Sequence, residues 1–175
     1  GGLVGRRNVL SIMIQSFVSM CCTTLLWWLV GYSLVFSGGQ GGVIGNLDQA
    51  FLRGISPMDA LSANNNIPLL VFIAYQMMFA IITPALITGA FANRVRFSAY
   101  MIFLTLWLVF VYFPVAHMVW GGGLFATWGV LDFAGGLVVH ITAGFSALAI
   151  ALVIGKRIGY GKDNMEPSNI PLVVI

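Results

Sequence analysis

The chain has 175 residues, of which 59% are hydrophobic and 7% are charged, and its net charge is +3. Soluble domains carry charge on about a quarter of their residues, so this composition excludes a water-soluble globular domain. It indicates an integral membrane protein. The sequence also lacks the clustered basic and aromatic residues that bind nucleic acid, so we expect no nucleic-acid partner.

Both ends of the chain are typical of a partial sequence. The first residue is Gly1, no signal peptide precedes the first apolar run, and the last apolar run stops at Ile175 after a few residues. We therefore expect an internal piece of a longer protein, with residues 1–175 forming part of one domain. The adjacent Cys21 and Cys22 lie within an apolar run and are expected to be reduced packing residues.

Four uncharged stretches are long enough to cross a bilayer as helices, which needs about 20 residues. A fifth stretch begins near the end of the chain and is truncated. The predicted fold class is all-α integral membrane. We expect about four complete transmembrane helices and the start of another, at 8–36, 67–92, 97–120, 133–155 and 170–175.

The connections between these stretches alternate in charge. Seven of the eight Lys and Arg residues lie before the first stretch, between the second and third, or after the fourth. Basic loops of membrane proteins stay in the cytoplasm, so we place these three connections there. The connections at 37–66 and 121–136 carry one basic residue, Arg53. We therefore expect both connections on the external side of the cell membrane, which this multi-pass protein crosses several times.

His140 is the residue with the clearest chemical meaning. It lies in the apolar run 133–154, which contains no other ionisable side chain. Ionisable groups at that depth are costly and usually face a bundle interior or a water-lined path. Gly136 and Gly144 lie four residues to either side, on the same helix face, and leave open volume beside the imidazole. We therefore predict that His140 handles a proton or a cation.

Aromatic and acidic residues gather near the expected external side. Tyr75 and Phe79 share one helix face, and Trp120 ends the third stretch just before three glycines. Asp132 lies at the start of the fourth stretch, about 12 Å along the axis from His140. Together these residues predict a route on which a small cation meets Trp120 through cation–π attraction, passes an aromatic constriction, and loses a proton.

Structural alternatives stay open for each of these residues. Trp120 is also typical of the interfacial aromatic belt of membrane proteins, and Tyr75 and Phe79 are typical packing aromatics. Asp132 fits a helix N-cap as well as a ligand-site role. His117, one turn before Trp120, is expected to be a hydrogen-bonding structural group. No metal-ligand cluster is evident, so we expect no metal site and no cofactor.

Several separated motifs stand in order along the chain: Gly1-Gly2-Leu3-Val4, Arg7-Asn8-Val9-Leu10, Arg94-Val95-Arg96-Phe97-Ser98, Ala116-His117-Met118-Val119-Trp120-Gly121-Gly122-Gly123, Leu131-Asp132-Phe133-Ala134-Gly135-Gly136, Val139-His140-Ile141, Gly155-Lys156-Arg157 and Asn169-Ile170-Pro171. In sequence and in order these motifs closely resemble the signature of ammonium transporters of the Amt/Mep/Rh superfamily, and their details favour the Amt type. The likeness covers almost the whole chain and is weakest in the loop 37–66.

The resemblance implies a parent with eleven transmembrane helices, an inverted repeat of two five-helix halves, and a trimer with one pore per subunit. Trp120 and Tyr75 would then belong to the external ammonium recruitment site, which Asp132 maintains. Phe79 would be one of two stacked gate phenylalanines, and His140 the first of two pore histidines. The second gate phenylalanine and the second pore histidine belong to later helices, which this chain does not include.

The predicted function is ammonium transport across the cell membrane. NH4+ would be recruited outside and deprotonated, and NH3 would be conducted through an apolar histidine-lined pore, with or without separate proton transfer. The main alternative is an ammonium sensor that uses the same fold with an added cytoplasmic signalling domain. An enzyme that uses His140 and Asp132 is disfavoured, since about two helical turns separate them and no nucleophile accompanies them. The resemblance also implies a PII-type regulatory protein at the cytoplasmic face.

Overall fold

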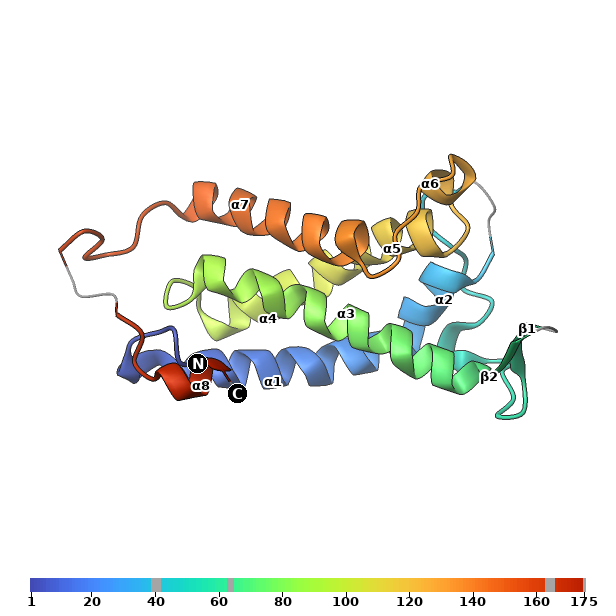
Figure 1. Cartoon of the computed structure of the whole chain (residues 1–175), viewed down its shortest axis with the longest axis horizontal. Helices are drawn as coiled ribbons and strands as arrows, with labels where there is room; N and C mark the ends of the chain where they lie inside the picture. The colour runs from blue at the N-terminus through green and yellow to red at the C-terminus, as the bar shows by residue number, and fades with distance from the viewer. Residues whose placement is uncertain (39–41, 63–64, 163–165, 175) are drawn as a thin grey trace.

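A computed structural model describes residues 1–38, 42–62, 65–162 and 166–174. Long apolar helices run side by side along the longest axis of the molecule (Figure 1). Within the described residues, four helical runs are long and apolar enough to cross a membrane: Arg6–Phe36, Leu69–Phe91, Phe97–Thr127 and Gly136–Ile154. This confirms the predicted fold class of an all-α membrane protein.

The first and third runs are each built from several helical segments. The first contains the 3-10 turn η1 (Arg6–Asn8), α1 (Val9–Leu26), the π-helix η2 (Trp27–Gly31) and α2 (Tyr32–Phe36). The third contains α4 (Phe97–Trp107), the π-helix η4 (Leu108–Tyr112), α5 (Phe113–Trp120) and, after three glycines, α6 (Leu124–Thr127). Pro114 is the second residue of α5, close to the point at which this continuous helical run changes from π to α hydrogen-bond spacing.

The second and fourth runs carry the predicted site. The second is α3 (Leu69–Phe91), which is continuous through Pro84. The fourth begins with the π-helix η5 (Gly136–Ile141) and continues as α7 (Thr142–Ile154). Helical structure here starts at Gly136 and not at the predicted Phe133, because Gly135 has the left-handed φ of 82° that breaks the helix.

The loop 37–66 contains more structure than its composition predicts. It holds the 3-10 turn η3 (Ala50–Leu52) and leads into two short antiparallel strands, β1 (Ala60–Ser62) and β2 (Asn65–Pro68). The Asn-rich segment has no alternation of apolar and polar residues, so its sequence gives no strand signal. At the other end of the molecule, α8 (Ile170–Val174) lies beside the start of α1 (Figure 1).

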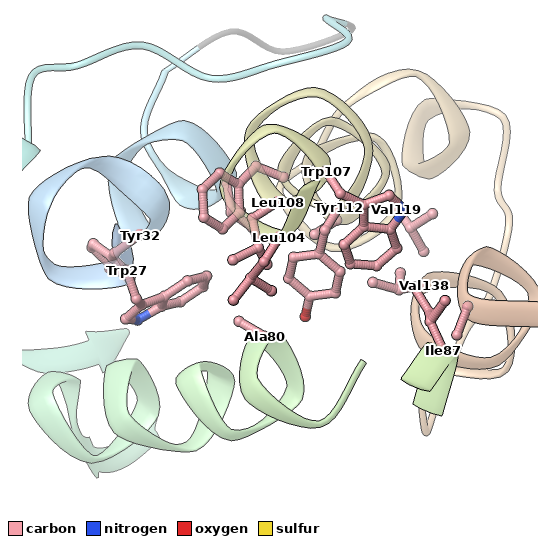
Figure 2. Packing of buried hydrophobic residues seen from close by; sticks show 14 of the residues in the cluster. Trp27, Tyr32, Ala80, Ile87, Leu104, Trp107, Leu108, Tyr112, Val119 and Val138 are labelled. Carbon is pink, nitrogen blue, oxygen red and sulfur yellow. The ribbon is translucent and has the colours of Figure 1, made fainter. Parts of the chain in front are cut away.

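The helices pack around one apolar core. α3 packs against both α7 and α1, while α2 packs against α5. Figure 2 shows Leu104 and Leu108, both fully buried, above the α3 helix that carries Ala80, and the Tyr112 hydroxyl pointing toward that helix. Large apolar side chains such as Phe17, Phe110, Phe145 and Leu152 are exposed on the outer faces of these helices.

The basic residues gather at one end of the bundle. Arg94, Lys156 and Arg157 line one cavity together with residues of the N-terminal segment, such as Leu3 and Asn8. The β hairpin and α6 lie at the opposite end (Figure 1). We refer below to the basic end and the hairpin end of the molecule.

Candidate functional site

Three aromatic side chains form a continuous row near the hairpin end. Tyr75 and Phe79 extend from α3, and their ring centroids lie 5.3 Å apart at 90°. Phe79 meets Trp120, the last residue of α5, with centroids 5.4 Å apart at 61°. Edge-to-face pairs at these distances are favourable. Tyr75 is 63% exposed while Phe79 and Trp120 are partly buried, so the row is open at the Tyr75 side.

The Trp120 indole is anchored to the segment that precedes the π-helix η5. Its Nε1–H donates a hydrogen bond to the backbone carbonyl oxygen of Asp132 at 3.1 Å. A Cβ atom placed on Gly135 would lie 3.7 Å from the edge of the same indole, so this segment passes close to the ring. The indole N–H of Trp120 therefore already has an acceptor within the protein, and this hydrogen bond fixes the orientation of the aromatic face.

Asp132 has the geometry of a helix cap. Its Oδ2 atom accepts hydrogen bonds from the backbone amides of Leu137, at 3.0 Å, and Val138, at 2.9 Å. First-turn amides have no partner within their own helix, and a negative charge is stabilised near a helix N-terminus. The N-cap residue of η5 is Gly135, three residues after Asp132, so Asp132 is not itself the N-cap. Its carboxylate nevertheless accepts hydrogen bonds from two first-turn amides, while the backbone of the same residue holds Trp120.

His140 lies within η5, where hydrogen bonds of longer spacing replace the α-helical pattern. Its backbone N–H donates to the Gly135 carbonyl at 2.9 Å, and the Thr142 hydroxyl donates to the Leu137 carbonyl at 3.0 Å. Single π turns inside helices occur frequently at functional sites. The imidazole is exposed in this chain, and a Cβ atom on Gly144 would meet nothing within 4 Å. His140 thus has open space on one side.

His117 is fully buried and fixes the end of α5. Its Nδ1 lies 2.8 Å from the carbonyl oxygen of Val35 in α2. Because a carbonyl oxygen only accepts, Nδ1 carries the hydrogen. The same contact explains Gly121, where a Cβ atom would lie 1.9 Å from that oxygen. The structural role expected for His117 is therefore observed, and it holds the helix end that carries Trp120.

Sequence reasoning did not identify Trp27 as part of this region. The Trp27 side chain is buried, and its Nε1–H donates to the Ile73 carbonyl in α3 at 3.2 Å. This bond ties the first helical run to α3 just before Tyr75. A carbonyl acceptor leaves no trace in the sequence, so no pattern indicated this partner.

Within the described ranges, no three His, Cys, Asp or Glu side chains gather in an arrangement able to hold a metal ion. The helices and contacts described above define a polytopic helical membrane protein in which an aromatic row adjoins the start of a histidine-bearing helix.

The chain belongs to the ammonium transporter family. The family model described as Ammonium Transporter Family matches residues 1–175. Ammonium transporter Amt1 of Archaeoglobus fulgidus is 46% identical over 174 residues, which cover 99% of this chain and 42% of the relative. Ammonium transporter 1 of Dictyostelium discoideum is 48% identical over 177 residues, covering 99% of this chain and 38% of the relative.

Solved structures agree with this assignment. Saccharomyces cerevisiae Mep2 matches with a TM-score of 0.83 and 36% identity, covering 99% of this chain and 40% of the Mep2 chain. The G343C mutant of Candida albicans Mep2 matches with a TM-score of 0.77 and 38% identity, covering 89% of this chain and 34% of the other. The chain thus spans about two fifths of the length of the curated relatives it matches. The relatives are named as transporters, in agreement with the prediction that the chain is not an enzyme.

Proposed function

We propose that the protein of which this chain is part transports ammonium across the membrane. Membership of the ammonium transporter family and the names of the curated relatives support this proposal. The single observation that carries the site is the continuous contact from Tyr75 through Phe79 to Trp120, whose indole is bonded to the segment leading into His140.

Recruitment of NH4+ is proposed at the open end of the aromatic row. A cation over an aromatic face gains about 0.5–2 kcal/mol, with the larger values where water is excluded. Trp120 suits this role because its N–H already has a carbonyl partner and its orientation is fixed. Tyr75 adds an exposed ring and a hydroxyl that can accept a hydrogen bond from ammonium. Phe79, between them, is proposed as the gate that a hydrated ion cannot pass.

Deprotonation is proposed as the step that lets the substrate enter the apolar path. Moving a charge to the bilayer centre costs at least about 2.5–3.5 kcal/mol, whereas neutral NH3 avoids most of that cost. A neutral imidazole has one ring nitrogen that accepts a proton and one that donates a proton, so His140 is suited to relay the released proton. NH3 would then cross with or without separate transfer of that proton.

Assembly and regulation are proposed from the resemblance. A homotrimer with one pore per subunit, and a PII-type protein at the cytoplasmic face, are what the family likeness implies. The basic end is the side proposed to face such a partner, because positively charged loops stay in the cytoplasm.

The test uses the full-length parent protein, purified and reconstituted in liposomes, with His140→Ala compared with wild type. We expect ammonium-dependent current to fall severalfold or to change its pH dependence, while the assembled protein keeps its oligomeric mass. Ile141→Ala, at the next and also exposed position, serves as the control and should leave the current near wild type. A wild-type-like current in His140→Ala would exclude the proton-relay role, and binding of ammonium without any flux in wild type would favour the sensor.

A further inference from the structure

We infer that Arg94 and Arg157 form a reciprocal clamp at the basic end, and that this clamp positions α3 against α7. α3 carries Tyr75 and Phe79, and α7 continues the segment that carries His140. The two arginines would thus be positioning residues for the aromatic row and the histidine. The structural part of this inference stands on its own, while its consequence for transport rests on the proposed function.

The two helices present the same electrostatic problem at this end. α3 and α7 both run from the hairpin end to the basic end and pack against each other (Figure 1). The last four carbonyl groups of a helix lack partners within the helix, and each C-terminus carries a partial negative charge. Two such ends side by side leave unpaired acceptors and repel each other.

Each arginine reaches the end of the other helix. Arg94 follows α3, and one of its terminal nitrogens donates to the carbonyl of Gly155, the residue that ends α7; the other donates to Ala90 in the last turn of α3. Arg157 follows α7, and its Nη2 donates to the carbonyl of Gly89 in α3 at 3.4 Å. The partners lie 61 and 68 residues apart in the chain.

The chemistry of guanidinium explains why this device uses arginine. Its planar fork offers several donors in fixed directions, so one side chain bonds carbonyls on two helices at once. Gly155 contributes by ending α7 with φ 75° and ψ −158°, a backbone conformation essentially restricted to glycine. Arg96, two residues from Arg94 in the same connection, is exposed, and its side chain has no hydrogen bond among the described residues. A positive charge in this loop is therefore not sufficient to form the hydrogen bond with the end of α7.

The clamp acts on the site through the stiffness of the helices. Phe79 lies about 20 Å along α3 from its basic end, and α3 contacts both α7 and the preceding η5, which carries His140. Freeing their ends removes the constraint that sets their relative height and tilt. Phe79 would then move relative to His140. A displacement on the order of 1 Å at the reacting groups is enough to change rates strongly.

The first experiment measures the clamp without reference to transport. Amide hydrogen exchange is compared in the purified full-length parent and in its Arg94→Ala, Arg157→Ala, Arg94→Lys and Arg96→Ala variants. Both clamp variants should accelerate exchange severalfold in the last turns of α3 and α7 together, including the helix from which the altered arginine does not extend. Arg94→Lys should show a smaller effect and Arg96→Ala none. Exchange that rises only next to the altered residue would overturn the clamp.

The second experiment measures its consequence as the ratio of ammonium to methylammonium transport by reconstituted protein. A ratio does not depend on the amount of folded protein, so a loss of yield alone leaves it unchanged. Arg94→Ala and Arg157→Ala should shift it by about threefold or more, with partial rescue by Arg94→Lys and no change in Arg96→Ala. An unchanged ratio would overturn the positioning role. Absence of transport in the wild type would instead refute the proposed function and leave the exchange result intact.

Discussion

Asp132 combines two tasks that depend on different atoms of one residue. Its carboxylate caps the amides of Leu137 and Val138, and its backbone carbonyl accepts the Trp120 N–H. A substitution of the side chain removes the cap but leaves the carbonyl in the chain. Any loss of Trp120 orientation in an Asp132 variant must therefore come through movement of the backbone.

We expect Asp132→Ala to lower the free energy of unfolding of the parent protein by about 1–2 kcal/mol, the usual cost of a lost N-cap. Asp132→Asn keeps an acceptor oxygen and should lower the free energy of unfolding by less. Denaturant titration in detergent measures the free energy of unfolding of both variants. Equal stability of Asp132→Ala and wild type would contradict the capping role.

The start of the histidine-bearing helix depends on a glycine that hydropathy does not single out. Gly135 has a φ of 82°, and its carbonyl accepts from both Val139 and His140. A Cβ atom there would lie 2.7 Å from Cγ2 of Val139, which is closer than carbon atoms approach. The left-handed turn, the double acceptor and the π-helix η5 belong to one local arrangement that sets the direction of His140.

Gly135→Ala tests that arrangement. An alanine would have to hold a left-handed backbone and displace Val139, so we expect the parent protein to lose about 1–3 kcal/mol of stability. Gly5→Ala is the matched control, because Gly5 has an ordinary φ of −58° and open space around its Cβ position. Thermal unfolding of both variants in the same detergent measures the difference. A Gly135→Ala variant as stable as the control would show that the turn adapts.

The predicted helices follow the sequence closely where the signal is local. Apolar length and the positions of charged residues predict four membrane-length helices, and the described part of the chain forms four. The π-helices η2, η4 and η5 were not predicted, because hydropathy depends on side-chain polarity and carries no information on hydrogen-bond spacing within a helix. The strands β1 and β2 were missed as well, since they are short and their pairing depends on contact between two segments.

For the molecule as a whole, the distribution of charge predicts one orientation in the membrane. The basic connections gather at one end in the structure, and positively charged loops stay in the cytoplasm. The hairpin end should therefore face outward, which brings the aromatic row to the external side.

Cysteine labelling tests this orientation. Ser56→Cys in the loop before β1 and Lys162→Cys after α7 are introduced separately into a parent protein whose Cys21 and Cys22 are replaced by Ala; positions 56 and 162 are both exposed. A membrane-impermeant thiol reagent should label Ser56→Cys on intact cells. It should label Lys162→Cys only after permeabilisation. The reverse pattern would contradict the predicted orientation.

Membrane class and the number of membrane-length helices in the described ranges follow from the chain alone, as does the prediction that His140 lies deep in one of these helices. Each depends on the length and polarity of consecutive residues. The tertiary structure decides which backbone oxygen accepts a hydrogen bond from each of four side chains: Trp120, Trp27, His117 and Arg94. Every residue carries a carbonyl group of the same chemistry, so no sequence pattern distinguishes the chosen acceptor from its neighbours. Only the packing of the helices brings one particular oxygen within reach of each donor, and those contacts hold the aromatic row against the histidine-bearing segment.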